Sequence, residues 1–284
     1  MTDIQVQQEK ATRFRNLHHT GRLLTLPNIW NPLGAAMLED LGYQAVATAS
    51  ASVALTNGYQ DGENIPFENL LEILKSIAKS VNIPVTADIE SGYASTKDQL
   101  SHNIERLIET GIVGINIEDS DKQTGKLYSI EAQCQRIELI RTVASQMSVP
   151  LFINARTDIY VKTDGLAPEE KFHQTVERAR AYRDAGADCF FPILMKEKED
   201  LQNIVSAVSL PVNVVALPGL PNLKSLEEMG IARLSLGPAF LKESIRAMKA
   251  MAANLLQYEG FDAVTGNPVT SDYLKQLVNK KIYK

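Results

Sequence analysis

The sequence is poor in the features that mark secreted or membrane-spanning proteins. Its 284 residues include only two cysteines, Cys134 and Cys189, and each lies within an apolar pattern. A disulfide framework is therefore not expected, and a reducing compartment is favoured. No apolar run approaches the roughly 18 residues of a membrane-spanning helix, and the first ten residues, MTDIQVQQEK, lack the apolar core of a signal peptide. We expect a cytoplasmic protein that does not enter a membrane.

Strongly basic segments are also missing. Lysine and arginine number 29 against 34 aspartates and glutamates, which gives a net charge of −5 with no polybasic run. This balance argues against a nucleic-acid-binding surface and against binding to an anionic membrane. A hydrophobic content of 44% in a chain of this length is enough for a sizeable core. The charge favours a small partner that is neutral or neutralised by a metal ion.

The chain lacks the glycine-rich phosphate loop that an open, doubly wound sheet usually carries after its first strand. The first predicted strand, residues 23–28, runs instead into LPNIWNP. Further junctions lead from helical patterns into apolar strands, through glycine at four places and proline at three. These strands are expected within residues 38–50, 79–90, 108–120, 145–156, 182–194, 207–218 and 226–238. Eight strand–helix units in this length predict a (β/α)8 barrel.

Helical extensions flank the predicted barrel. Residues 1–22 have the pattern of an added N-terminal helix, and residues 240–284 have that of a C-terminal helical region. Neither an interdomain linker nor a low-complexity segment interrupts the chain. We therefore expect residues 1–284 to form a single barrel domain with these two extensions.

Charged side chains follow three neighbouring strands of the predicted barrel. Asp88 and Glu90 end the third strand. Glu118 and Asp119 end the fourth, and Arg156 lies in the fifth. Because the carboxyl ends of barrel strands form the active-site face, these side chains are expected to share one mouth. Carboxylates crowded in a half-buried space either take up protons or hold a cation. Mg²⁺ is the natural ion, since it prefers oxygen ligands and uses few carboxylates directly.

A structural role is the alternative for each acid taken singly, since strand-end carboxylates also cap helices and pair with arginines. A cluster on three consecutive strands favours a functional site over a set of caps. Arg156 offers a planar guanidinium that suits a substrate carboxylate. The pattern thus predicts a metal-assisted site for a small carboxylate.

Several motifs, taken in order along the chain, resemble one family. The chain is similar to the isocitrate lyase/phosphoenolpyruvate mutase superfamily in PVTADIESGY, GINIEDS and INARTD, in the stretch from LPNIWNP to QDGE, and in PVNVVALPGLPNLKSLEEMGIARLSLGPA. The resemblance covers residues 20–250. It implies a (β/α)8 barrel that binds Mg²⁺ and makes or breaks C–C or P–C bonds next to a carboxylate through enolate-like intermediates. It also implies C-terminal helices exchanged between subunits of a homotetramer.

The same resemblance implies roles for individual residues. Asp88 matches the direct Mg²⁺ ligand, with Mn²⁺ as the alternative ion, and the ion's water shell is assigned to Asp61, Glu90 and Glu118. The implied catalytic residues are Arg156, Glu118 and Asp61. The implied substrate-binding residues are Ser50, Ala51, Ser52, Arg156 and Asn213. Plainer interpretations remain, because QDGE is also a turn signal and TASAS also suits a polar loop.

Two departures from the family bear on the reaction. Isocitrate and methylisocitrate lyases carry a Lys-Lys/Arg-Cys-Gly-His loop after the fourth strand, where this chain reads SDKQTGKLYSIEAQCQRI. Cys134 and Cys189 are expected to be small hydrophobic residues of a helix and a strand, so cysteine-dependent lyase activity is disfavoured. The sixth strand ends in apolar Ile193 where the family has a histidine or glutamate. Loop 119–128 is either a gate or an ordinary connector.

The sequence leaves three functions open. The preferred one is a Mg²⁺-dependent carbon–carbon lyase or decarboxylase acting on a small 2-oxo or 2-hydroxy acid. The second is a phosphonate enzyme that acts on a P–C bond, as a mutase or a hydrolase. The third is a barrel that binds a metabolite without catalysis, and retention of the acids with Arg156 argues against it.

Overall fold

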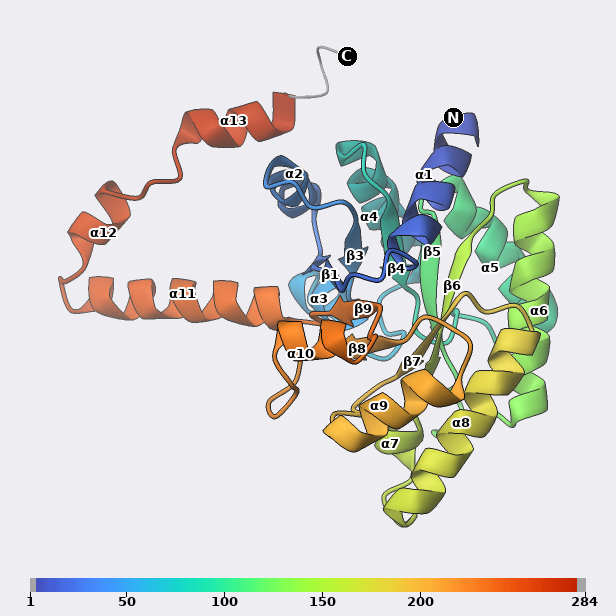
Figure 1. Ribbon diagram of the computed structural model, residues 1–284. Helices are drawn as coiled ribbons and strands as arrows, with labels where there is room; N and C mark the ends of the chain where they lie inside the picture. The colour runs from blue at the N-terminus through green and yellow to red at the C-terminus, as the bar shows by residue number, and fades with distance from the viewer. Residues whose placement is uncertain (1–3, 280–284) are drawn as a thin grey trace.

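Parallel strands form the centre of the protein in this computed structural model, which describes residues 4–279 (Figure 1). The strands are β1 (Leu24–Leu26), β2 (Asn28–Ile29), β3 (Val46–Thr48), β4 (Val85–Asp88), β5 (Gly114–Glu118), β6 (Phe152–Thr157), β7 (Cys189–Pro192), β8 (Asn213–Val215) and β9 (Arg233–Ser235). Two sets pair in the orders β2-β3-β4-β5-β6-β7 and β1-β9-β8. Residues 1–3 and 280–284 of the two predicted extensions lie outside the described residues.

The two sets of strands join into one ring. A parallel bridge between Phe190 and Val212 connects β7 to the segment that enters β8. On the other side, β1 continues into β2 through Pro27, whose carbonyl accepts a 3.0 Å hydrogen bond from the Ala47 N–H. Since β1 and β2 act as one stave, the ring has eight staves, and the predicted (β/α)8 barrel is confirmed.

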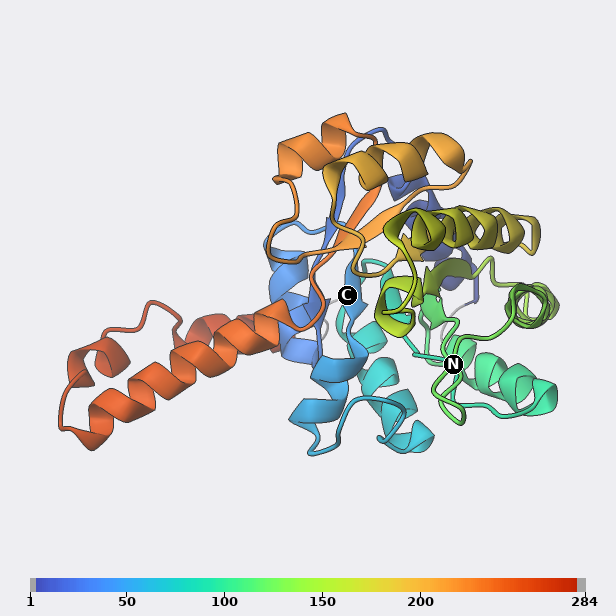
Figure 2. The same cartoon turned by 90° about the horizontal axis from the view of Figure 1, so that it is seen from below.

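Helices alternate with the strands. The helices of the described residues are α1 (Ile4–Leu17), α2 (Pro32–Asp40), α3 (Ser50–Thr56), α4 (Phe67–Ser80), α5 (Lys97–Glu109), α6 (Ile130–Gln146), α7 (Ile159–Lys162), α8 (Pro168–Asp184), α9 (Lys198–Ala207), α10 (Leu223–Glu228), α11 (Ala239–Leu256), α12 (Phe261–Thr265) and α13 (Ser271–Asn279). Figure 2, turned by 90°, shows α4, α5, α6, α8 and α9 around the strands. Strand and helix patterns in the sequence therefore correspond to observed elements.

Local sequence signals explain where many helices begin and end. The Asn31 side chain accepts a 2.8 Å bond from the Gly34 N–H and so caps α2, and Ser129 caps α6 through a 3.1 Å bond from the Ala132 N–H. All four glycines at the predicted helix-to-strand junctions have positive φ, from 82° to 106°. They are Gly42, Gly111, Gly186 and Gly230. Glycine adopts this conformation without a side-chain clash, which ends each helix and turns the chain into the next strand.

Helix α1 closes the amino-terminal end of the barrel. Its fully buried Phe14 packs edge-to-face on Phe152 at the start of β6, with ring centroids 5.0 Å apart. Above this apolar layer the barrel interior is polar. Asn154 donates to Asn116 at 2.7 Å, and the buried Arg233 donates to the Ser235 hydroxyl at 3.1 Å. Barrel interiors are usually filled by branched apolar residues, so this polar layer is unusual. It lies between the apolar layer at the amino-terminal end and the carboxyl-terminal mouth.

The C-terminal helices form an arm beside the barrel. Helix α11 projects away from the strands, and α12 and α13 turn back, as Figure 1 shows. Helix α13 contacts α2, where the Tyr273 hydroxyl donates to Asp40 at 3.1 Å. No helix within residues 4–279 is both long and apolar enough to cross a membrane.

Candidate active site

The structure brings Asp88, Glu90, Glu118 and Arg156 together near the carboxyl ends of adjacent strands. Asp88 is the last residue of β4 and Glu118 the last residue of β5. In the strand register Asp88 lies opposite Asn116 and Glu118 lies opposite Arg156. Because side chains alternate along a strand, Asn116 and Glu118 point to the same side, into the barrel. One mouth therefore collects charged groups from β4, β5 and β6.

Arg156 is held between two carboxylates. Its Nη1 atom lies 3.0 Å from Glu118 Oε2, and its Nε atom lies 2.6 Å from Asp158 Oδ1. Only 16% of the Arg156 side chain is exposed. Burial alone would lower the pKa of Arg156, but the Glu118 and Asp158 carboxylates outweigh it and raise the pKa. The guanidinium is thus a fixed positive charge at the edge of the mouth.

Lys122, from loop 119–128, lies between the two glutamates. Its Nζ atom is 2.6 Å from Glu118 Oε1 and 2.9 Å from Glu90 Oε2. The glutamate side chains are each only 3% exposed, whereas that of Lys122 is 31% exposed. Sequence reasoning missed this residue, although its position four residues after Glu118 in a charged loop was a usable signal.

Glu90 is tied to the loop that follows α3. The Glu63 N–H donates to Glu90 Oε1 at 2.7 Å. The Glu63 carboxylate in turn accepts bonds from the Ser91 N–H at 3.0 Å, the Ser91 hydroxyl at 2.7 Å and the Tyr93 N–H at 3.0 Å. Glu63, Glu90 and Tyr93 all have positive φ, of 61°, 51° and 54°. Non-glycine residues in this region are strained, so these contacts fix an unfavourable backbone next to the mouth.

Asp88 is oriented by the first residue of α3. Its Oδ2 atom accepts bonds from the Ser50 N–H at 3.3 Å and the Ser50 hydroxyl at 3.1 Å. Its Oδ1 atom accepts a 3.3 Å bond from the Glu90 N–H. Asp88 is half-buried, which leaves part of the carboxylate open to the mouth. Ser50, which was predicted to bind the substrate, therefore contacts Asp88, which was predicted to bind the metal ion.

Burial dominates the electrostatics of the two glutamates. It raises the pKa of Glu118 to about 7, against the opposing effect of Arg156, and it raises the pKa of Glu90 against the opposing effect of Lys122. Burial lowers the pKa of Lys122, and its two glutamate partners outweigh this and raise it. These carboxylates are tolerated because cations lie against them.

Asp119 does not join the mouth. It is fully buried on the outer side of β5, where Oδ2 accepts bonds from Arg178 at 3.0 Å and the Tyr182 hydroxyl at 2.7 Å. Its other oxygen accepts a 2.8 Å bond from the Asp158 N–H. The expectation that Glu118 and Asp119 both face the mouth is therefore wrong, because adjacent strand residues point to opposite sides.

Other predicted site residues lie around this network rather than in it. Asp61 is exposed in a turn, where its carbonyl accepts a 3.0 Å bond from Asn64. Ala51 is half-buried and Ser52 fully buried within α3. Asn213 is fully buried in the polar interior, where it accepts a 3.1 Å bond from Ser235. The roles of these residues stay predictions. Both cysteines are free, with Cys134 half-buried on α6 and Cys189 buried in β7.

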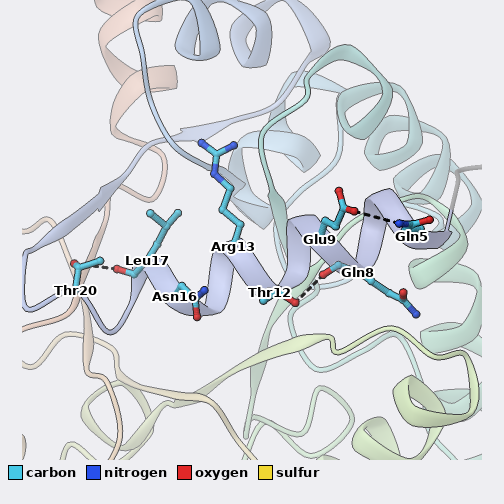
Figure 3. Close-up of a pocket in the computed structure, with 8 residues that line it drawn as sticks. All are labelled: Gln5, Gln8, Glu9, Thr12, Arg13, Asn16, Leu17 and Thr20. Atoms are coloured by element: carbon cyan, nitrogen blue, oxygen red, sulfur yellow. Dashed lines mark hydrogen bonds between the residues drawn. The ribbon is translucent and has the colours of Figure 1, made fainter.

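A cavity of about 380 Å³ opens beside Lys122, between loop 119–128 and the segment after Glu90. Its lining includes Tyr93, Tyr128 and Lys122. A wider hollow of about 650 Å³ runs along the exposed face of α1 (Figure 3). The side chains there point in several directions, as Figure 3 shows, and α1 covers the amino-terminal end of the barrel through Phe14 on Phe152. Of these two hollows, the cavity beside Lys122 adjoins the acid cluster, because Lys122 contacts both Glu90 and Glu118.

The donor set fits a hard divalent cation. Carboxylate oxygens supply every negative charge at the mouth, and Mg²⁺ prefers such ligands. Within residues 4–279 no three histidine, cysteine, aspartate or glutamate side chains converge closely enough to ligate one ion directly. Mg²⁺ commonly keeps several waters and uses one or two carboxylates, so a single direct ligand, Asp88, with water-mediated partners agrees with this geometry.

The fold and the mouth together define a (β/α)8 barrel with a cluster of charged groups at its carboxyl-terminal end. Residues 14–256 match the phosphoenolpyruvate phosphomutase family model. The chain belongs to this family, within the superfamily that also contains the isocitrate lyases, as its sequence motifs implied. That superfamily consists of enzymes, among them carbon–carbon lyases and phosphonomutases.

Individual relatives come from both branches of chemistry. A crystal structure from Burkholderia cenocepacia J2315, provisionally described as a phosphonomutase, has 37% identity and a TM-score of 0.83, and covers 86% of this chain and 99% of its own. The 2-methylisocitrate lyase of Halalkalibacterium halodurans is 26% identical over 213 residues, 72% of this chain and 67% of the lyase. Phosphonopyruvate hydrolase, solved with oxalate and Mg²⁺, has a TM-score of 0.83 at 21% identity, with 96% of each chain covered, which shows the shared fold alone.

Proposed function

We propose that the protein is a Mg²⁺-dependent enzyme that makes or breaks a C–C bond next to a carboxylate in a small 2-oxo or 2-hydroxy acid, through an enolate-like intermediate. The observation that carries this proposal is the continuous network from Ser50 through Asp88, Glu90, Lys122 and Glu118 to Arg156. A related fold that binds oxalate with Mg²⁺ supports it, since oxalate resembles the enolate of pyruvate.

In this proposal each residue has a separate task. Asp88 would hold the cation directly, and Glu90 and Glu118 would accept hydrogen bonds from its waters. When bound, the cation stabilises negative charge that develops on the substrate oxygen. Arg156 binds the substrate carboxylate and, because Glu118 and Asp158 already fix it, needs little reorganisation during the reaction. Ser50 keeps the Asp88 carboxylate in its orientation.

A phosphonate reaction is the second candidate. The relative with 37% identity favours it, because that protein is provisionally described as a phosphonomutase. The two candidates differ in the bond that is broken, and NMR distinguishes them. Phosphorus NMR on phosphonopyruvate detects the P–C reaction, and proton NMR on oxaloacetate and substituted malates detects the C–C reaction. The expected result for the preferred function is loss of an oxo or hydroxy acid with the phosphonate unchanged.

Replacing Asp88 by Ala tests the proposed ligand. Asp88→Ala should lower Mg²⁺-dependent turnover about a hundredfold or more, because electrostatic stabilisation of this kind is worth ~3 kcal/mol. The circular dichroism spectrum should remain that of the wild type. Asp164→Ala, which removes an exposed carboxylate outside the network, is the matched control and should keep full turnover. Full activity of Asp88→Ala would remove this residue from the mechanism.

We also propose that the protein assembles as a homotetramer in which C-terminal helices are exchanged between subunits. Support comes from helix α11, which carries apolar side chains that are more than half exposed. Three of them are Ile245, Met248 and Leu256. A second copy of the chain is the partner that this family resemblance implies.

A further inference from the structure

Lys122 occupies both glutamate oxygens that remain available at the mouth. Glu118 uses Oε2 for Arg156, and its Oε1 atom lies against Lys122. Glu90 uses Oε1 for the Glu63 N–H, and its Oε2 atom lies against Lys122. The water shell of a divalent cation would need these same two oxygens. The ammonium group and the hydrated ion therefore compete for these two oxygens, and the positive charge of Lys122 opposes the binding of a second cation beside it.

The charges at the mouth favour replacement of Lys122 by a divalent cation. The mouth holds four carboxylates, those of Asp88, Glu90, Glu118 and Asp158, against the two cations Arg156 and Lys122, and the charge of Arg233 acts on Asp88 from the barrel interior. Removing Lys122 alone would leave the almost fully buried Glu90 carboxylate without a charged partner, and Glu118 with Arg156 alone, which is costly. A divalent cation supplies more positive charge than Lys122 does. A bound divalent cation would thus supply the counter-charge that Lys122 now gives to Glu90 and Glu118.

Lys122 sits near the tip of a compact hairpin rather than on a loose loop. Ser120 and Leu127 form an antiparallel bridge, and the Asp121 N–H donates to the Lys126 carbonyl at 2.8 Å. The Asp121 carboxylate accepts a 2.9 Å bond from the Gln123 N–H. Because the hairpin is internally bonded, a shift of the Lys122 backbone would move the tip as a unit. The tip is otherwise tied across the cavity by an exposed bond from Gln123 to Ser95 at 2.6 Å.

We propose that Lys122 is a built-in counter-ion that competes with the divalent cation for Glu90 and Glu118, and that cation binding releases the tip of hairpin 119–128. Lys122 is in this sense a positioning residue, since it acts on the cation through the two glutamates. The inference rests on the metal site of the proposed function. It adds that the metal affinity is held down, and coupled to the hairpin, by the chain's own lysine.

Direct measurement of Mn²⁺ binding tests this role without an activity assay. The full-length protein and three variants are titrated with Mn²⁺ by calorimetry, and free Mn²⁺ is followed by electron paramagnetic resonance. Lys122→Gln should bind Mn²⁺ about tenfold more tightly than the wild type, because the ion no longer displaces a charged partner. Lys122→Arg keeps the charge and should bind more weakly than Lys122→Gln. Lys126→Gln, on the same hairpin, is the matched control and should bind as the wild type does.

Hydrogen exchange supplies an independent readout of the hairpin. In the wild type, Mn²⁺ should increase exchange over residues 121–126. In Lys122→Gln, exchange there should already be high without Mn²⁺ and should change little when the ion is added. Circular dichroism establishes that each variant is folded, and Lys122→Met, which keeps most of the apolar stem, replaces Lys122→Gln if that variant unfolds.

The outcomes separate this role from the proposed function. If the wild type binds Mn²⁺ and a folded, charge-removing variant binds it equally or more weakly, the role of Lys122 is overturned while the metal site stands. If Mn²⁺ binds tightly to the variant but exchange in the wild-type hairpin does not respond, the coupling to the hairpin is overturned. If neither protein binds Mn²⁺, the metal site fails, and the role of Lys122 fails with it.

Discussion

Asp88, Glu90 and Glu118 at the mouth each have a donor of their own from a neighbouring helix, loop or strand. Ser50 fixes Asp88, Glu63 fixes Glu90, and Arg156 fixes Glu118. A buried acid with one oxygen fixed has few ways to reorient, so its other oxygen faces the mouth in a defined direction. This arrangement suits a site that binds charge without rearranging, which is the condition for effective electrostatic catalysis.

His18 provides a test of pH dependence far from the mouth. Its ring stacks on Phe152 at 4.2 Å, and burial, followed by the charge of Arg233, lowers the pKa of His18 to about 3. The folded protein therefore keeps His18 neutral, whereas the unfolded chain binds a proton below a pKa of about 6.5. The stability contributed by neutral His18 is complete above pH 6.5 and is lost as the pH falls toward 3, by about 2 kcal/mol at pH 5.

Urea unfolding at pH 7.5 and pH 5 measures this loss. His18→Leu should lose about 2 kcal/mol less stability between these two pH values than the wild type, whatever its stability at pH 7.5. His173→Gln removes an exposed histidine and should follow the wild type. Identical pH dependence of His18→Leu and the wild type would show that His18 does not titrate as its burial implies.

At the scale of elements, the strands and their boundaries were largely predictable. Glycine and proline at the junctions have local conformational reasons to be there, and Gly42 and Gly111 adopt the positive φ that such junctions require. The alternation of side chains along a strand also predicts that Asp119 faces outward, because Asp119 directly follows the inward-facing Glu118. That signal was available in the sequence and would have removed Asp119 from the predicted mouth.

Loops could not be predicted in the same way. The segment 119–128 has no periodicity, yet it folds into a hairpin through contacts such as the bond from Gly125 N–H to the Asp121 carbonyl at 2.8 Å. The turn QDGE points to Asp61, whereas Glu63 makes the contacts to Glu90 and Ser91. Which residue of a turn faces a site depends on long-range contacts, and these leave no local pattern in the sequence.

At the scale of the whole molecule, the arm formed by α11, α12 and α13 exposes apolar side chains that a single subunit does not cover. Exposed apolar side chains on a long helix are typical of a surface that another chain covers. Wild-type protein is expected to have the mass of a tetramer by light scattering. The double variant Ile245→Glu, Met248→Glu should give a smaller species, because it places charges in the proposed interface.

Lys249→Glu, a charge change on the same helix at an exposed position, is the control and should keep the wild-type mass. A wild-type protein that is monomeric at micromolar concentration would contradict the proposed exchange of helices. So would a double variant that is folded and still tetrameric.

The central claim is that the acids at the mouth bind a divalent cation that in turn binds an enolate-like ligand, and thermal unfolding with oxalate tests it most directly. With Mg²⁺ present, oxalate at about 100 times its Kd should raise the wild-type Tm by about 5 °C. Without Mg²⁺, and in Asp88→Ala with Mg²⁺, the Tm should not change. A wild-type Tm that is unaffected by saturating oxalate and Mg²⁺, or that rises equally without the ion, would contradict the account.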